Sequence, residues 1–193
     1  MAPGRPLIGV LALQGGFEAH ERVLARLGAA VREVRVPADL HDLDGLVLPG
    51  GESTTMMLGI AREGLAEPLR ALAARGTPVL ASCAGMILLD REHLGVMDML
   101  AERNAFGRQI RSFEADVHVQ GIDGEPIRGI FIRAPWIAEH GAGVEVLGAL
   151  DGHTVAVREG ALLAVSFHSE LSSDDRLHAM FLDLVAASEI DGR

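Results

Sequence analysis

Short apolar runs alternate with stretches of helical periodicity through the first half of this chain. The runs Leu7 to Leu13, Gly45 to Leu48 and Pro78 to Ala81 are apolar almost throughout, which is typical of strands covered by helices on both faces. Phe17 to Leu27 and Leu65 to Arg75 carry apolar residues at helical spacing. Strands that alternate with helices predict an α/β fold, a three-layer sandwich with a mostly parallel central sheet.

The second half of the chain has a different rhythm. After about Leu94, strand-like segments and glycine-containing turns follow one another. The segments are 114–119, 129–132, 144–147, 154–158 and 161–167, and a final helix is expected over 174–187. They predict extra antiparallel strands at the edge of the sheet. Because 193 residues contain no repeat and no linker, we expect a single domain over residues 1–193.

Composition excludes several classes of partner and chemistry. The net charge of −10 without a basic cluster argues against nucleic acid. No apolar run approaches the ~20 residues that cross a bilayer, so no membrane partner is expected. The N-terminus lacks the apolar region of a signal peptide, which predicts a soluble, cytoplasmic protein. All 17 basic residues are arginine, so lysine Schiff-base chemistry and the phosphate-loop motif are both excluded.

The single cysteine lies where an apolar strand meets a helix. Cys83 follows the strand-like run 78–82, and the small residues Ala81, Ala84 and Gly85 allow a sharp turn around it. A nucleophile in such an elbow is exposed to the amides at the start of the next helix, which favour a thiolate. A lone cysteine excludes an internal disulfide, and the alternative to a reactive thiol is a small buried hydrophobe.

A histidine and an acid follow the last apolar run. His168 and Glu170 are two residues apart, so in an extended segment they share one face. His168 is then placed to take a proton from Cys83, while Glu170 fixes its tautomer and stabilises the imidazolium. A histidine in a polar turn is the alternative. The other histidines lack metal-ligand spacing and are expected at the surface, with no metal and no cofactor: His20, His41, His93, His118, His140, His153 and His178.

Two adjacent glycines follow another apolar run. Gly50 and Gly51 come after Leu46 to Pro49 and precede a helix start at Glu52 to Thr55. Adjacent glycines leave their amides free to approach an oxyanion, and ligands bind at the carboxyl ends of strands in open parallel sheets. Taken alone, the pair is also compatible with a routine turn.

In this order the three features resemble the class I glutamine amidotransferases, which have a flavodoxin-like fold. The chain looks most like the glutaminase subunit of pyridoxal 5′-phosphate synthase within that superfamily. The matching runs are Gly9–Gly15, Leu48–Thr55, Glu102–Gln109, Ser112–Ala115 and Gly129–Pro135. The runs from Arg103 to Gln109 and from Phe131 to Pro135 separate this subfamily from the other glutaminases.

The resemblance implies that glutamine is hydrolysed to glutamate and ammonia by a triad of Cys83, His168 and Glu170 through a thioester. Ammonia would pass to a synthase subunit in the same hetero-oligomer. That subunit makes pyridoxal 5′-phosphate and uses a lysine of its own for the chemistry. L-Glutamine would be held by Gly51, Glu52, Ser53, Arg103, Ile132 and Arg133. We expect the backbone amides of Ala84 and of Gly50 or Gly51 to form the oxyanion hole.

The chain departs from the family pattern at three places. It has Ala81-Ser82-Cys83 where Gly-Thr-Cys is more common, Ser169 where a proline usually lies, and a short segment over 90–94. Three alternatives remain open: the glutaminase subunit of another amidotransferase, a different hydrolase with a cysteine elbow, and a non-catalytic subunit that binds glutamine. The hydrolases of the second kind often place histidine directly after the cysteine, where this chain has Ala84.

Overall fold

The structure is a computed structural model and describes residues 4–106 and 112–191. Its helices are α1 (Phe17–Arg26), α2 (Ser53–Arg62), α3 (Ala66–Ala74), α4 (Ala84–Leu89) and α5 (Arg176–Asp191), with 3₁₀ turns η1 (Pro37–Leu40) and η2 (Ser169–Leu171). Its strands are β1 (Leu7–Leu11), β2 (Ala30–Val34), β3 (Gly45–Leu48), β4 (Val79–Ser82), β5 (Met99–Glu102), β6 (Ser112–Val117), β7 (Ile127–Ile132), β8 (Trp136–His140), β9 (Glu145–Leu150), β10 (His153–Glu159) and β11 (Leu162–Val165).

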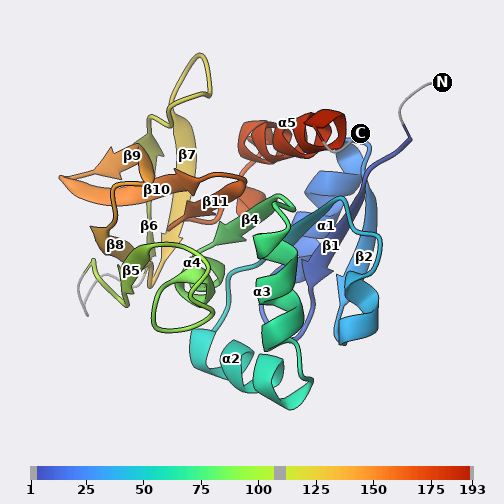
Figure 1. The fold of residues 1–193 in the computed structure, drawn as a ribbon. Coiled ribbons are helices and arrows are strands. Elements are labelled where there is room, and N and C mark those ends of the chain that lie inside the picture. Colours follow the sequence, from blue (N-terminus) through green and yellow to red (C-terminus); the bar gives the residue numbers. More distant parts are fainter. Residues whose placement is uncertain (1–3, 107–111, 192–193) are drawn as a thin grey trace.

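One mixed sheet forms the centre of the fold (Figure 1). Its order is β2-β1-β3-β4-β11-β10-β8-β5, with β9 paired to β10. The strands from β2 to β11 pair in parallel, and the remaining strands pair antiparallel at one side. The prediction of a mostly parallel sheet extended by antiparallel strands is confirmed. Strands β6 and β7 form a separate antiparallel pair, which the sequence did not predict.

Helices cover both faces of the sheet, as the apolar strands predict. In β3, Leu46 and Leu48 pack in one cluster with Met56 of α2, whereas Val47 packs in a second cluster with Phe181 of α5. Successive residues of a strand point to opposite faces, so one apolar strand supplies both clusters. The three-layer architecture is therefore confirmed. Among the described residues, no helix is long and apolar enough to span a membrane.

Three strands escaped prediction because their sequences are not apolar runs. Strands β2, β5 and β8 each contain charged residues and partly exposed positions. The predicted elements lie where they were expected, with ends that differ by a few residues; the last helix begins at Arg176 and continues to Asp191. The final apolar strand, β11, ends at Val165 and not at Phe167.

The three predicted site loops lie at the same edge of the sheet. Strands β3, β4 and β11 are neighbours, with Leu48 beside Ala81 and Ser82 beside Val165. Their parallel pairing places all three carboxyl ends together. The loops that follow them, which carry Gly50, Cys83 and His168, therefore meet there.

Candidate active site

Cys83 occupies a strained turn between β4 and α4. Its backbone has φ 49° and ψ −109°, a left-handed value of φ that L residues rarely adopt. Its N–H donates to Val165 O at 2.8 Å, and a side chain at Gly85 would lie 2.0 Å from Leu48 O. Glycine is therefore required there for α4 to approach β3. Because Ala84 is the first residue of α4, its amide has no acceptor within the helix.

His168 and Glu170 make the contact that their spacing predicted, by a different backbone route. The distance from His168 Nδ1 to Glu170 Oε1 is 2.6 Å, and both side chains are buried. The expected extended segment is wrong, because Glu170 lies in the 3₁₀ turn η2, which begins directly after His168. The His168 N–H donates to Ile130 O of β7 at 2.8 Å, and this bond fixes the backbone that carries the ring.

The surroundings of the pair favour charge on both groups. Burial lowers the pKa of His168, but hydrogen bonds and charge from Cys83 and Glu170 outweigh it and raise the pKa from 6.5 to about 10. Burial raises the pKa of Glu170, but the electrostatic attraction of His20 and the contact with His168 outweigh it, so that pKa is lowered. An imidazolium beside a carboxylate is the arrangement that a general acid and its orienting partner require.

The glycine loop packs directly on the His168 ring. A methyl group at Gly50 would lie 2.2 Å from His168 Cε1, so only glycine fits at this position. The Gly50 carbonyl accepts the Gly16 amide at 3.0 Å. Because the C=O and N–H of one peptide point in opposite directions, the Gly51 amide points away from Gly16.

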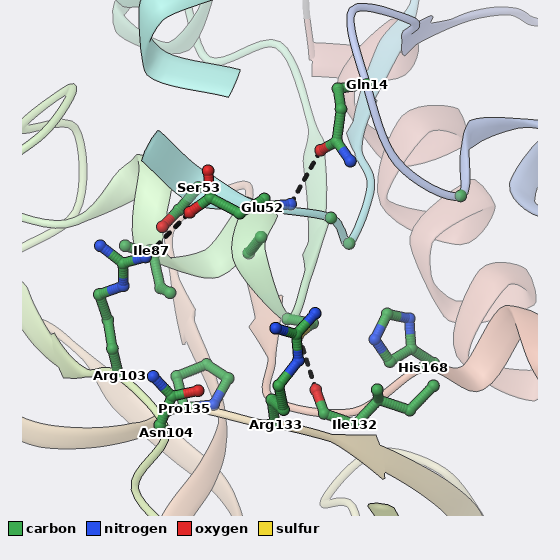
Figure 2. A pocket seen from close by; sticks show the side chains of 15 residues that line it. Gln14, Glu52, Ser53, Ile87, Arg103, Asn104, Ile132, Arg133, Pro135 and His168 are labelled. Carbon is green, nitrogen blue, oxygen red and sulfur yellow. Dashed lines mark hydrogen bonds and ion pairs between the residues drawn. The ribbon is translucent and has the colours of Figure 1, made fainter. Parts of the chain in front are cut away.

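A cavity of about 320 Å³ lies in front of these groups (Figure 2). It brings together nearly all of the predicted site residues, and Glu170 lies behind His168 and outside the lining. The predicted residues that line it are Gly50, Gly51, Glu52, Ser53, Cys83, Ala84, Arg103, Ile132, Arg133 and His168. The Cys83 Sγ lies 3.9 Å from the Ile132 carbonyl, and Arg133 has a left-handed φ of 44°.

Glu52 and Arg103 form an ion pair at one side of the cavity (Figure 2). Arg103 Nη2 lies 3.0 Å from Glu52 Oε1, and its Nη1 donates to Thr54 Oγ1 at 3.2 Å. Glu52 also caps α2, and hydrogen bonds from Thr55 and Thr54 lower its pKa from 4.5 to about 2. The site therefore presents a fixed carboxylate and a guanidinium side by side, which suits the ammonium and carboxylate of an amino acid.

Sequence reasoning missed five residues that line the cavity: Gln14, Gly16, Ile87, Asn104 and Pro135. Gln14 Oε1 accepts the Glu52 N–H at 2.8 Å and so fixes the end of the glycine loop. Gln14, Asn104 and Pro135 belong to the matching runs, which was the available signal, whereas Gly16 and Ile87 lie outside those runs. The last residues of one run, Gly107 to Gln109, lie outside the described residues.

The expectation that the other histidines lie at the surface is wrong for two of them. His20 and His178 are fully buried behind Glu170, because α1 and α5 both pack on this face of the sheet. His41, His118 and His140 are exposed, and His93 and His153 are partly buried. Within residues 4–106 and 112–191, no group of three or more His, Cys, Asp and Glu side chains is placed to hold a metal ion.

Comparison with known proteins identifies the family. The SNO glutamine amidotransferase family matches residues 10–187. The chain belongs to this family. A protein of Streptomyces coelicolor named pyridoxal 5′-phosphate synthase subunit PdxT is 52% identical over 192 residues, covering 95% of both chains. A protein of the same name from Frankia alni is 50% identical over 192 residues, covering 95% of this chain and 96% of its own.

Solved structures agree with the family. A structure described as a glutamine amidotransferase superposes with a TM-score of 0.87 at 44% identity, covering 93% of this chain and 98% of its own. A putative GMP synthase subunit from Thermoplasma acidophilum has a TM-score of 0.75 at 18% identity, covering 99% and 100%, and supports the fold alone. The predicted class I glutamine amidotransferase fold is therefore confirmed.

Proposed function

We propose that this chain is the glutaminase subunit of a pyridoxal 5′-phosphate synthase, acting as a single glutaminase domain. It hydrolyses L-glutamine to L-glutamate and ammonia and passes the ammonia to the synthase subunit. The observation that carries the proposal is the Cys83 elbow beside the His168–Glu170 pair, in a cavity lined by the residues expected to hold glutamine. The relatives named as this subunit, near 50% identity over almost the whole chain, support the substrate and the partner.

The proposed chemistry is acyl transfer. Cys83 Sγ attacks the side-chain amide carbon of glutamine, and the C=O π electrons move to oxygen to give a tetrahedral oxyanion. The oxyanion collapses, the C–N bond breaks, and His168 gives its proton to the departing nitrogen. Water then attacks the thioester with His168 as base, and glutamate leaves with Cys83 regenerated. Glu170 stays ionised and stabilises the imidazolium throughout.

Two backbone amides are assigned to the oxyanion. Ala84 N–H has no intrahelical acceptor and lies directly after the nucleophile. The second amide comes from the glycine loop, at Gly50 or Gly51, both of which line the cavity. Each donor placed at the developing charge contributes on the order of 10²-fold to 10³-fold in rate.

Glutamine binding is assigned to the opposite end of the cavity. Glu52 attracts the α-ammonium group, and Arg103 and Arg133 attract the α-carboxylate. Ser53 and the Gly51 and Ile132 backbone complete the contacts. When the amino acid enters, the ion pair between Arg103 and Glu52 either breaks or accepts the charged groups of the amino acid as additional partners.

Two competing functions make different predictions. A cysteine hydrolase of another kind is disfavoured because Ala84 follows the cysteine. A non-catalytic glutamine-binding subunit has no need for a reactive thiol. Alkylation by iodoacetamide separates these functions from a glutaminase, in which Cys83 reacts faster than a model thiol and bound glutamine protects Cys83 from alkylation.

The test is release of ammonia and glutamate from glutamine, measured for the chain alone and with the pyridoxal 5′-phosphate synthase subunit added. We expect release that rises with the synthase subunit and disappears in Cys83→Ala. The Gly143→Ala variant is a matched control, since a methyl group there meets only Glu159 Oε1 at an ordinary 3.5 Å. Absence of release in both conditions would support the non-catalytic alternative.

A further inference from the structure

Four polar side chains from four elements meet in a buried cluster behind the cavity. His20 comes from α1, Ser82 from β4, Glu170 from η2 and His178 from α5, and none is more than 6% exposed. Burying polar groups is costly unless they are partnered, so such a cluster is held in place by its internal contacts. The steps proposed for glutamine hydrolysis use Glu170 but neither His20 nor His178.

His20 lies at the centre of the cluster. Its Nδ1 is 2.9 Å from His178 Nε2, and its Nε2 is 3.1 Å from Ser82 Oγ. The same Nε2 lies 3.5 Å from Glu170 Oε2, whereas Glu170 Oε1 contacts His168. His20 and His168 therefore face the two oxygens of one carboxylate. Among the described residues, Glu170 Oε2 has no hydrogen bond of its own.

The charge of Glu170 favours one of the two neutral tautomers of His20. An unprotonated Nε2 would direct a lone pair at the Glu170 carboxylate, which is repulsive, whereas Nε2–H is attracted to it. We therefore assign the proton to Nε2, where Ser82 Oγ at 3.1 Å can accept it as well, and Nδ1 then accepts the Nε2–H of His178. His178 Nδ1 is then a bare lone pair, and among the described residues it has no hydrogen-bond partner.

Both buried histidines are neutral at neutral pH. Burial, with a smaller contribution from the neighbouring His20, lowers the pKa of His178 from 6.5 to about 3. Burial also lowers the pKa of His20, against the opposing effect of Glu170. The cluster therefore offers Glu170 an N–H dipole without adding a second positive charge beside His168.

We propose that His20 is a positioning residue for the glutaminase reaction: its Nε2–H holds Glu170 Oε2 so that Oε1 stays on His168, and His178 fixes the His20 tautomer. This inference rests on the proposed function, because it assigns Glu170 its role in orienting His168. The separation of 3.5 Å is long for a hydrogen bond, so His20 acts on the carboxylate through its dipole and its packing.

A matched pair of variants separates this role from simple packing between α1 and α5. In His20→Gln the amide nitrogen takes the place of Nε2 and still faces Glu170. In His20→Asn the amide takes the place of Nδ1 and faces only His178. Both variants remove one ring from a buried site, and asparagine leaves the larger cavity, so a purely structural role predicts that any difference in activity follows the difference in melting temperature.

The experiment measures kcat and KM for glutamine hydrolysis with the synthase subunit, together with the iodoacetamide alkylation rate of Cys83 in the chain alone. We expect kcat and the alkylation rate to fall about tenfold or more in His20→Asn and less than threefold in His20→Gln. KM should stay within about twofold in both, because His20 does not reach the cavity. Thermal melting of each variant shows how much stability each has lost.

Equal kcat in the two His20 variants would overturn the proposal, whatever their melting temperatures. If neither variant folds, His178→Phe applies the same test one contact further away, because it removes only the donor that fixes the His20 tautomer. A severalfold lower kcat at unchanged KM is then expected, and an unchanged kcat would refute it. If the wild-type chain releases no ammonia with the synthase subunit, the proposed function fails, while the alkylation rates still report on His20 itself.

Discussion

Replacing Gly50 by alanine tests how tightly the glycine loop and the proposed general base fit together. The new methyl carbon would lie 2.2 Å from His168 Cε1, 2.9 Å from Nδ1 and 3.2 Å from Nε2. Ordinary contact begins near 3.4 Å, so the ring or the loop must retreat by about 1.2 Å. The ring cannot move freely, because Nδ1 is held 2.6 Å from Glu170 and the His168 backbone is bonded to Ile130.

The size of the effect follows from that displacement. Misplacing a catalytic group by about 1 Å costs on the order of 10²-fold in rate, so we expect kcat to fall about 100-fold. Overpacking a filled site also lowers the free energy of unfolding by about 1–3 kcal/mol. The variant should therefore remain folded, with a melting temperature lower by roughly 2–4 °C for each kcal/mol.

Steady-state ammonia release with the synthase subunit measures this prediction, with Gly143→Ala as the control for a tolerated alanine. Alkylation of Cys83 gives a readout that does not depend on the partner, and it should slow in parallel with kcat. A Gly50→Ala enzyme within threefold of the wild-type kcat would refute the reasoning, since it would mean that the ring and loop are not in contact during turnover.

Four further predictions follow from the site. Arg103→Ala should raise the KM for glutamine by about 10-fold to 100-fold, the loss of one charge-assisted contact, with kcat changed by less than threefold. Glu170→Gln should lower kcat by 10²-fold or more with little change in KM, because the His168 tautomer is no longer fixed. Ser169→Pro should raise the melting temperature by about 1–4 °C, because Ser169 is the first residue of η2 and follows an extended residue, a position that suits proline. The buried Ser169 hydroxyl, which the change removes, has no hydrogen-bond partner among the described residues. The pKa of His178 is lowered to about 3 in the folded chain, whereas the same group takes up a proton near pH 6.5 in the unfolded chain. The free energy of unfolding should therefore fall as the pH drops below 6.5, by about 1.4 kcal/mol per pH unit for this group. Chemical denaturation at pH 7, 6 and 5 should show a smaller dependence of the free energy of unfolding on pH in His178→Phe than in the wild type.

The sequence predicted the parts of the fold that apolar periodicity controls. Strands β3 and β4 are continuous apolar runs because helices cover both faces, and their ends were predicted within one residue. Strand β8 contains Glu139 and His140 at exposed positions of the antiparallel side, so its sequence carries little periodicity. The pairing of β6 with β7 depends on contacts between segments that local sequence does not encode.

More of the site than of the fold could be predicted, because the site residues lie at the ends of strands. Cys83, His168 and Gly50 could be placed together once the sheet was taken to be parallel. The His168–Glu170 contact was predicted from an extended backbone, but the structure makes it across a 3₁₀ turn. The burial of His20 and His178 was missed because each lies on a helix whose packing partner is distant in the sequence.

The central claim is that Cys83 is the nucleophile that attacks glutamine. Intact-protein mass spectrometry after incubation with 6-diazo-5-oxo-L-norleucine, a diazo ketone analogue of glutamine, tests it most directly. We predict one covalent adduct per chain, mapped to the peptide that contains Cys83, formed faster with the synthase subunit and suppressed by excess glutamine. No adduct at Cys83, or labelling that glutamine does not suppress, would contradict the account.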